Sequence, residues 1–285
     1  MPFLYNIGFG ENKEKKLLLG NSELKSLLYH NIFDYPLTER ELVKWVAGTK
    51  VEAVVKEEYV AKQKNGLYFL KGKEGVVYKR LLKKRISARK IQIAKKTANL
   101  LSAIPTIKLI AITGSLAMEN ASDNSDVDLL IVTKKDALWT TRLITYFVLR
   151  IMNYELRKPG DQNQKDKLCM NMWLDESDLS WPAGDRNSYT AHEIAQIKPL
   201  LNKNGTYEKF MDDNVWLKDY WPNAVHAERT ADSVQRTDKN LRFIEKLAFK
   251  LQLIYMRRKI TREIVTPNRA IFHPYDWGEV VLARL

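Results

Sequence analysis

The chain has 285 residues and only one cysteine, Cys169, so a disulfide framework and a cysteine-rich zinc site are both excluded. A single thiol fits a reducing compartment, and we expect a cytoplasmic protein. No segment approaches the roughly 20 apolar residues of a membrane-spanning helix, and the first residues lack the pattern of a signal peptide. The four histidines lie far apart in the sequence. These absences predict no membrane partner and no histidine-based metal site.

Acidic residues are outnumbered by basic ones, and the formal net charge of +13 favours an acidic partner such as nucleic acid, a nucleotide or an anionic surface. The segment from Lys79 to Lys96 contains nine Lys or Arg residues and no acid. Aliphatic residues interleave with these charges, which predicts an amphipathic helix. Its basic face could follow a nucleic-acid backbone, or it could be the solvated surface of a helix that joins two domains.

One motif indicates chemistry. An apolar run from Ile110 ends in Gly114 and Ser115, and Asp126 and Asp128 follow in an aliphatic strand. Residues two apart in a strand share a face, so the two carboxylates project together and repel each other unless a cation lies between them. Magnesium suits such a pair, because it takes oxygen ligands from carboxylates and phosphates. Gly114 lets the backbone approach a phosphate, and the Ser115 hydroxyl can donate to it.

These residues resemble the signature of the DNA polymerase β-like nucleotidyltransferase superfamily, and the likeness covers about residues 105 to 175. The resemblance implies that Gly114 and Ser115 hold the β- and γ-phosphates of a nucleoside triphosphate. It also implies that Asp126 and Asp128 are ligands of Mg²⁺, or of Mn²⁺ in its place. An ordinary loop followed by a solvated sheet edge is the alternative, but acids in an aliphatic strand are costly without a partner.

Members of this superfamily generally have a third carboxylate on a later strand. The best later strand here, Lys167 to Leu174, has Asn171 as its one interior polar residue. Asn171 could ligate a metal through its oxygen, but it could not serve as a base. Glu193, within Ala191 to Ile194, is the second candidate and would supply the base from a helix. For both residues, an ordinary surface or capping role is an equally good interpretation.

The residues before the basic segment form a separate unit, 1–78. Leu24 to His30 predicts a short helix, and Thr38 with Glu41 predicts a capping box at the start of a second. Val51, Val54 and Val55 suggest a third helix that ends near Tyr59. Asn65-Gly66 then predicts a hairpin between the segments 59–64 and 67–71. Three helices and a hairpin resemble a winged helix, which could bind DNA or dock another protein.

The remaining chain reads as mostly helical. Ala137 to Tyr154 predicts a helix on the sheet. Three further helices are expected: one over Thr190–Leu201 that is interrupted near Pro199, one over Tyr207–Leu217 and a long one over Leu241–Arg262. Four aromatic residues could line an acceptor pocket or pack in the core: Tyr189, Trp216, Tyr220 and Trp221. We therefore expect a nucleotidyltransferase core over 79–180, which includes the basic linker helix, and a helical C-terminal domain over 181–285.

The predicted fold class is α+β, with a winged helix, a mixed β-sheet core with flanking helices and a C-terminal helical domain. The predicted function is Mg²⁺-dependent transfer of a nucleoside monophosphate from a nucleoside triphosphate to an unidentified acceptor hydroxyl, with release of pyrophosphate. The alternative is a catalytically weakened relative that acts as a nucleic-acid-binding or nucleotide-sensing regulator through the winged helix. The sequence predicts no oligomeric state.

Overall fold

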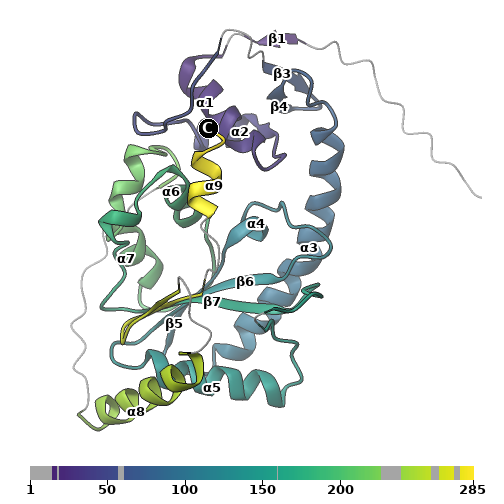
Figure 1. Ribbon diagram of the computed structural model, residues 1–285. Coiled ribbons are helices and arrows are strands. Elements are labelled where there is room, and N and C mark those ends of the chain that lie inside the picture. Colours follow the sequence, from purple (N-terminus) through teal and green to yellow (C-terminus); the bar gives the residue numbers. More distant parts are fainter. Residues whose placement is uncertain are drawn as a thin grey trace, which may run out of the picture.

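The computed structural model of the protein (Figure 1) describes residues 15–17, 19–56, 61–158, 160–225, 239–257, 263–272 and 277–285. The described strands form a small four-stranded sheet and a larger six-stranded sheet. Figure 1 shows the small sheet at one end of the molecule and the large sheet toward the other, with the long helix α3 (Val76–Leu101) running beside both. The α+β class is thus confirmed as a mixed arrangement of helices and sheets.

The N-terminal region contains the elements that local sequence signals predict best. The Thr38 side chain accepts from the Glu41 amide and Glu41 accepts from the Thr38 amide, so the expected capping box begins the second helix. Asn65 and Gly66 have φ angles of 53° and 75°, as the expected hairpin turn requires. The elements are β1 (Lys15–Leu17), α1 (Asn21–Asn31), β2 (Leu37–Thr38), α2 (Glu39–Lys44), β3 (Ala61–Lys64) and β4 (Leu67–Leu70).

The predicted third helix is wrong wherever the structure describes its residues, and residues 57–60 lie outside that description. Residues 51–56 lie in neither a helix nor a strand, with Val51 and Ala53 buried and their neighbours exposed. The backbone donates outside the segment: the Lys50 amide to the Asp219 carbonyl, and the Val54 amide to the Leu285 carbonyl. These tertiary bonds replace the bonds of a helix. The winged helix therefore stays a prediction, without a recognition helix among the described residues.

The basic segment forms the predicted helix, α3. Four of its nine cations form ion pairs inside the protein: Lys79, Arg80, Arg89 and Lys90. The Lys90 side chain is completely buried and its amine donates to Asp166 Oδ1 (2.7 Å) and to the Ser125 carbonyl (2.6 Å). A large part of the expected basic face thus holds the fold together. Nucleic-acid binding by this helix stays a prediction.

The large sheet has the strand order β8-β5-β6-β7-β10-β9. Its centre consists of β5 (Ile107–Ile112), β6 (Val127–Thr133) and β7 (Leu168–Asp175), with the short helix α4 (Gly114–Ala117) after β5 and α5 (Leu138–Ile151) between β6 and β7. The β5–β6 pair is antiparallel and the β6–β7 pair is parallel. One face of the sheet packs on α3 and α5, and the other faces α6 and the N-terminal region.

The C-terminal region is not purely helical, because three of its strands join the large sheet. The predicted helix over Thr190–Leu201 is wrong in its second half, where Pro199 lies in an edge strand that pairs with β5. The elements are η1 (Ala183–Asp185), α6 (Ser188–Ala195), β8 (Lys198–Asn202), α7 (Thr206–Asp212), η2 (Val215–Asp219), α8 (Lys239–Met256), β9 (Ile264–Val265), β10 (Arg269–Ile271) and α9 (Trp277–Leu282). The predicted division at residues 78 and 180 stays a prediction.

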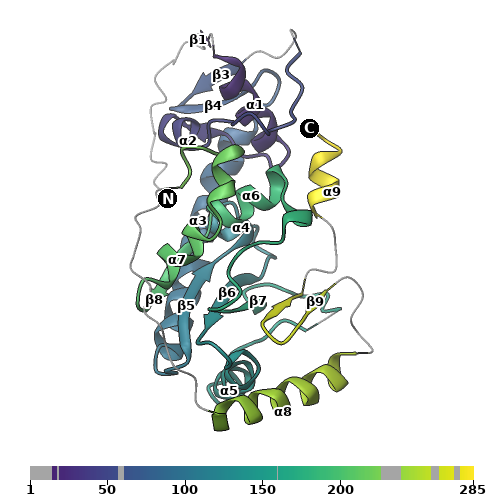
Figure 2. The same cartoon turned by 90° about the vertical axis from the view of Figure 1, so that its left-hand side faces the viewer.

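Figure 2, turned by 90°, shows that α5 and α8 lie at the end of the molecule opposite the N-terminal region, as in Figure 1. The second helix expected in the C-terminal region forms only in part, since α7 and η2 are separate. The third is present as α8 up to Met256, and residues 258–262 of its expected range lie outside the described residues. Among the described helices, none has both the length and the apolar character to cross a bilayer.

Candidate active site

Strand β6 and the residue before it present the two predicted carboxylates on one face of the sheet. Val127 and Leu129 enter the core shared with α3 and α5, so the alternation of a strand directs Asp126 and Asp128 to the opposite face. Asp126 is buried and Asp128 is half-buried. One oxygen of each lies within 4.8 Å of the other and of the Cys169 sulfur. The expected pairing of the carboxylates is therefore present.

Asp126 is held by a cation that sequence reasoning missed. The Arg157 Nη1 donates to Asp126 Oδ2 at 2.7 Å and lies 3.5 Å from the Cys169 sulfur. Arg157 belongs to the connection before β7, where no periodicity or motif marks it. Its guanidinium offsets part of the negative charge of the site. Burial and the nearby carboxylates raise the pKa of the Cys169 thiol, so it stays protonated, in the form that is a poor metal ligand.

Asp128, unlike Asp126, forms no ion pair with a basic side chain among the described residues. Burial, followed by the charge of Asp126, raises its pKa from the ordinary 3.8 to about 7. Asn171 Nδ2 donates to Asp128 Oδ1 at 2.9 Å, and the Cys169 thiol also donates a hydrogen bond to the Asp128 carboxylate. Because both of these donors are uncharged, they offset only part of the free-energy cost of a buried negative charge on Asp128. Asp128 is thus the group in the site that most needs a cation.

Asn171 lies on the face of the carboxylates, because it is two residues from Cys169 along β7. Asp128 pairs with Cys169 and Leu130 pairs with Met172, so three residues of β7 advance while β6 advances two. The alternation of the strand sets Asn171 on the same face as Cys169, and the bulge breaks that alternation only after Asn171, so that Met172 packs in the core on this face as well. Within the described part of the chain, the buried Asn171 Oδ1 has no hydrogen-bond partner. An unpaired buried oxygen beside two carboxylates is a donor atom suited to a hard cation.

The turn after β5 meets the carboxylates, as the sequence predicts. Gly114 has a φ of +59°, and a side chain there would place its Cβ 3.1 Å from Asp128 Oδ2. The Thr113 amide donates to the Asp128 carbonyl at 3.1 Å, which fixes the turn against β6. Ser115 follows in the first turn of α4 and is exposed. The glycine is therefore required by the close approach of Asp128.

Glu193 also lies beside this site. Gln196 Nε2 donates to Glu193 Oε1 at 2.7 Å and to the Gly114 carbonyl at 3.2 Å, which ties helix α6 to the turn. Burial and the charge of Asp128 raise the pKa of Glu193 from 4.5 to about 7. By contrast, Asp175 accepts from the Asp136 amide at the far end of β7 and has no contact with the pair. Gln196 was not predicted, because its role depends on the packing of α6.

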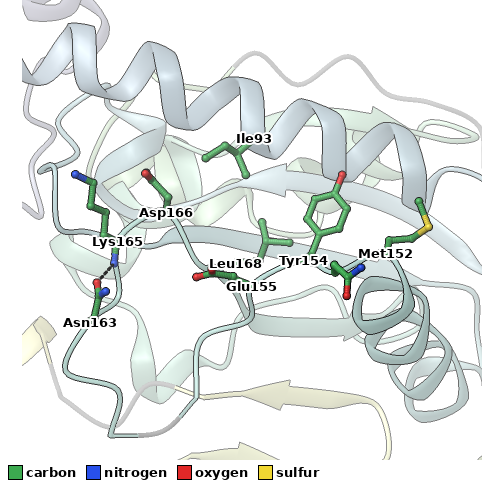
Figure 3. A pocket seen from close by; sticks show the side chains of 9 residues that line it. Ile93, Met152, Tyr154, Glu155, Asn163, Lys165, Asp166 and Leu168 are labelled. Atoms are coloured by element: carbon green, nitrogen blue, oxygen red, sulfur yellow. Dashed lines mark hydrogen bonds between the residues drawn. The ribbon is translucent and has the colours of Figure 1, made fainter.

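A cavity of about 520 Å³ lies elsewhere (Figure 3). Its lining residues come from α3, the end of α5 and the connection to β7, and Figure 3 shows Tyr154, Ile93 and Leu168 around it. Leu168 belongs to the core on the α3 side of the sheet, the side opposite Asp126 and Asp128. This cavity is therefore separate from the acidic site.

The aromatic residues considered for an acceptor pocket do not share one role. Trp221 is completely buried, and its Nε1 donates to the Ser188 carbonyl at 3.0 Å. Trp216 and Tyr220 form a separate edge-on pair with ring centroids 5.9 Å apart. Trp221 is thus a core residue, which agrees with the alternative of core packing for that position.

The Gly-Ser turn lies beside the paired aspartates, which is the arrangement that the sequence predicts for a nucleotidyltransferase core. Residues 92–175 match the family model of the nucleotidyltransferase domain. The matched segment includes Gly114, Ser115, Asp126, Asp128 and Asn171, whereas α6 lies beyond it. No curated protein shows significant sequence similarity to the chain. The match supports a transferase that uses a nucleotide.

Proposed function

We propose that the protein transfers a nucleoside monophosphate from a nucleoside triphosphate to an acceptor hydroxyl and releases pyrophosphate. The observation that carries this proposal is the convergence of Gly114, Asp126, Asp128 and Asn171 at one place. These residues come from the turn after β5, from β6 with the residue before it, and from β7, within the segment that matches a nucleotidyltransferase domain. In the reaction, the acceptor oxygen bonds to the α-phosphorus as the bond from that phosphorus to the pyrophosphate oxygen breaks.

The donor atoms fit Mg²⁺, or Mn²⁺ in its place. Asp126 and Asp128 would supply carboxylate oxygens, and Asn171 would supply the buried oxygen that has no other partner. A bound divalent ion would offset the charge of the carboxylates and of the phosphates in the transition state. The protonated Cys169 thiol would remain a hydrogen-bond donor to Asp128.

Three residues would then handle the substrates. Gly114 would let the backbone approach the β- and γ-phosphates, and the exposed Ser115 hydroxyl would donate to them. Glu193 would accept the proton of the acceptor hydroxyl, since a base with a pKa of about 7 takes a proton near neutral pH and can release it again. In this scheme Glu193 replaces the third carboxylate that Asn171 cannot provide.

A second function is favoured by two specific observations. Asn171 stands where a carboxylate is expected, and Arg157 pairs with Asp126 at 2.7 Å. Both features lower the negative charge of the site. A protein that binds a nucleotide without turning it over would retain the fold and lose the base, and it would act as a nucleotide-sensing or nucleic-acid-binding regulator through its N-terminal region.

The two functions differ in pyrophosphate release. We would incubate the protein with Mg²⁺ and α-labelled triphosphates, together with pools of RNA, protein and small-molecule acceptors. The test variant is Asp126→Ala with Asp128→Ala, and the control is Asp212→Ala, a carboxylate on α7 outside the site. Calorimetry with Mn²⁺ measures metal binding separately from turnover.

Pyrophosphate release by the wild type and the control, and a loss of at least about 10³-fold in the double variant, would support the transferase, because a metal contributes several kcal/mol to such a barrier. Triphosphate binding without release would favour the regulator. If the wild type bound neither Mn²⁺ nor triphosphate, both proposals would fail.

A further inference from the structure

The outer surfaces of α5 and α8 carry an apolar patch. Ten large apolar side chains on these two helices and the residue that follows α5 are between 42% and 73% exposed: Leu143, Ile144, Phe147, Ile151, Met152, Phe243, Ile244, Leu247, Leu251 and Ile254. Both helices lie at the same end of the molecule (Figures 1 and 2). We call these ten residues the α5–α8 patch. Such a concentration is unusual, because exposed apolar residues in a monomer are normally scattered.

One face of helix α8 is covered by the rest of the protein, whereas its outer face is apolar and exposed. Glu245, Ala248, Gln252 and Met256 form the buried face. Gln252 Nε2 donates to the Trp139 carbonyl at 2.8 Å, so this face is fixed to the start of α5. A helix that needed only this anchor would have a polar outer surface.

The outer face of α8 has the spacing of a helix-pairing seam. Ile244, Leu247, Leu251 and Ile254 follow one another at intervals of three, four and three residues, and all four are at least half exposed. This is the repeat that places side chains as knobs between those of a facing helix. On α5, Ile144, Phe147 and Ile151 continue the apolar surface at intervals of three and four. The spacing of the exposed apolar residues on both helices therefore indicates that further helices pack against this surface.

Charges lie beside the seam and not on it. Lys246, Lys250 and Arg257 are exposed and lie about a quarter of a turn from the centre of the seam. Glu245, the one acid in the sequences of α5 and α8, is buried and accepts from the Trp139 and Thr140 amides. The seam itself is uncharged, whereas its border is basic.

We propose that the α5–α8 patch is the contact surface between two copies of this chain. The ten side chains expose on the order of 1,000 Å², which exceeds the 300–600 Å² of the largest patch on a typical monomer and reaches the roughly 800 Å² per partner of a stable interface. A two-fold axis would set α5 and α8 of one copy against the same helices of the other, so that each seam is covered by an identical one. The basic strips would then lie at the rim.

The like charges at the rim give this dimer a diagnostic salt dependence. Exposed charges are screened as the Debye length falls from about 10 Å at 0.1 M salt to about 3 Å at 1 M. Salt should therefore strengthen the dimer. An anionic membrane or an acidic partner protein would bind the same basic and apolar surface more weakly as salt rises.

Sedimentation velocity of the full-length chain tests the proposal. The wild type should sediment as a species of twice the 33.2 kDa chain mass, with a lower dissociation constant at high salt. Leu247→Glu with Leu251→Glu should give the single-chain mass. The matched control is Leu81→Glu with Leu82→Glu, because these α3 residues are 52% and 48% exposed and the α8 pair is 50% and 56% exposed. Circular dichroism verifies that each variant is folded.

Four outcomes would overturn the proposal. These are a wild type that remains monomeric up to its solubility limit, a dimer that survives the α8 change, a dimer that is lost equally in the α3 control, and a dimer that salt dissociates. Flotation with vesicles of phosphatidylglycerol provides the competing result, and binding of a monomer that the α8 change abolishes would assign the patch to a lipid surface instead.

Discussion

Two clusters of buried polar groups lie on either side of helix α6, and neighbouring residues of that helix belong to different clusters. Glu193 belongs to the acidic cluster with Asp128, where burial raises the pKa of both groups to about 7. His192 belongs to an aromatic cluster, where its ring lies 4.0 Å from that of Trp45 and its Nε2 lies 3.1 Å from His30 Nε2. Burial lowers the pKa of both histidines.

The same physical cause thus leads to different outcomes. In each cluster burial disfavours the charged form. The histidines resolve this by being neutral: His30 Nδ1 donates to the Ser26 carbonyl, and its Nε2 can then accept from His192. The acidic cluster keeps two close carboxylates and an unpaired Asn171 oxygen. The comparison indicates that the aromatic cluster with the two histidines stabilises the fold, whereas the acidic cluster has the arrangement of a cation-binding site.

The largest effect is expected in the aromatic cluster. Trp221→Ala should lower the free energy of unfolding by about 3–5 kcal/mol, because it leaves a cavity among the buried rings of Tyr29 and His192. Urea denaturation followed by circular dichroism measures the loss. Trp216→Ala, at a half-buried tryptophan outside the cluster, is the control and should cost clearly less. Equal losses would show that the cluster has no special role in stability.

The histidine pair predicts a loss of stability in acid. A depressed pKa means that the folded state prefers the neutral ring, so stability is present above pH 6.5 and is lost as the pH falls through the His30 pKa of about 4. The loss for His30 is about 3 kcal/mol, since each pKa unit corresponds to about 1.4 kcal/mol. Glu41 and Arg80 act on His30, and Lys44 acts on His192, with smaller influence than burial.

Denaturation of His30→Gln at several pH values measures this effect. Glutamine can still donate to the Ser26 carbonyl but does not titrate, so its stability should fall less steeply between pH 6.5 and 4. The wild type and the variant should have parallel profiles above pH 7, where the histidines are neutral. The same slope in acid for both proteins would assign the acid sensitivity to other groups.

Glu193→Gln should reduce turnover by about 10²-fold, as expected for the loss of a general base, if the proposed transfer is correct. The rate of pyrophosphate release in the wild type should rise with pH and level off above about 7, and this dependence should vanish in the variant. Affinity for the triphosphate should change little. Gln196→Ala provides a comparison that keeps the carboxylate and removes its donor. Loss of triphosphate binding in Glu193→Gln would indicate a structural role.

The smallest expected effect is on stability, and it distinguishes Asp128 from Asp126. The pKa of Asp128 is raised, so its contribution to stability is present below pH 3.8 and is lost as the pH rises through about 7. In the presence of a chelator, Asp128→Asn should therefore stabilise the protein above pH 7, by on the order of 2 kcal/mol after solvent screening, and should have little effect near pH 4. Thermal unfolding at both pH values measures it.

Asp126→Asn is the matched control for this prediction. It breaks the 2.7 Å ion pair with Arg157, so it should destabilise the protein under the same conditions. Added Mn²⁺ should stabilise the wild type more than either variant. If both substitutions shifted stability in the same direction, the distinction between a paired and an unpaired carboxylate would be wrong.

Local signals predicted a substantial part of the fold. The Thr38 capping box, the Asn65-Gly66 turn and the helix over Lys79–Lys96 depend on residues close in sequence, and all three are present. Pro199 was expected only to interrupt a helix, because nothing near it reveals that β5 has a free edge for it to pair with. Valines at 51, 54 and 55 have helix-like spacing, but the carbonyls that the segment's backbone uses belong to Asp219 and Leu285.

The candidate site likewise has features that the sequence predicted and features that it did not. Alternation in a strand determined that Asp126 and Asp128 share a face, and the requirement for positive φ at a close approach determined Gly114. The partners of these residues were decided by the tertiary structure. Arg157 reaches Asp126 from a connecting segment, and Asn171 meets Asp128 only because β7 pairs with β6 in this register.

The sequence by itself therefore determined which residues could carry the chemistry, because periodicity and backbone limits act over a few residues. The tertiary structure decided the protonation state of those residues. Desolvation and charge pairing depend on groups far along the chain, such as Glu193 beside Asp128 and Arg157 beside Asp126, and these groups meet only when the sheet and α6 have packed.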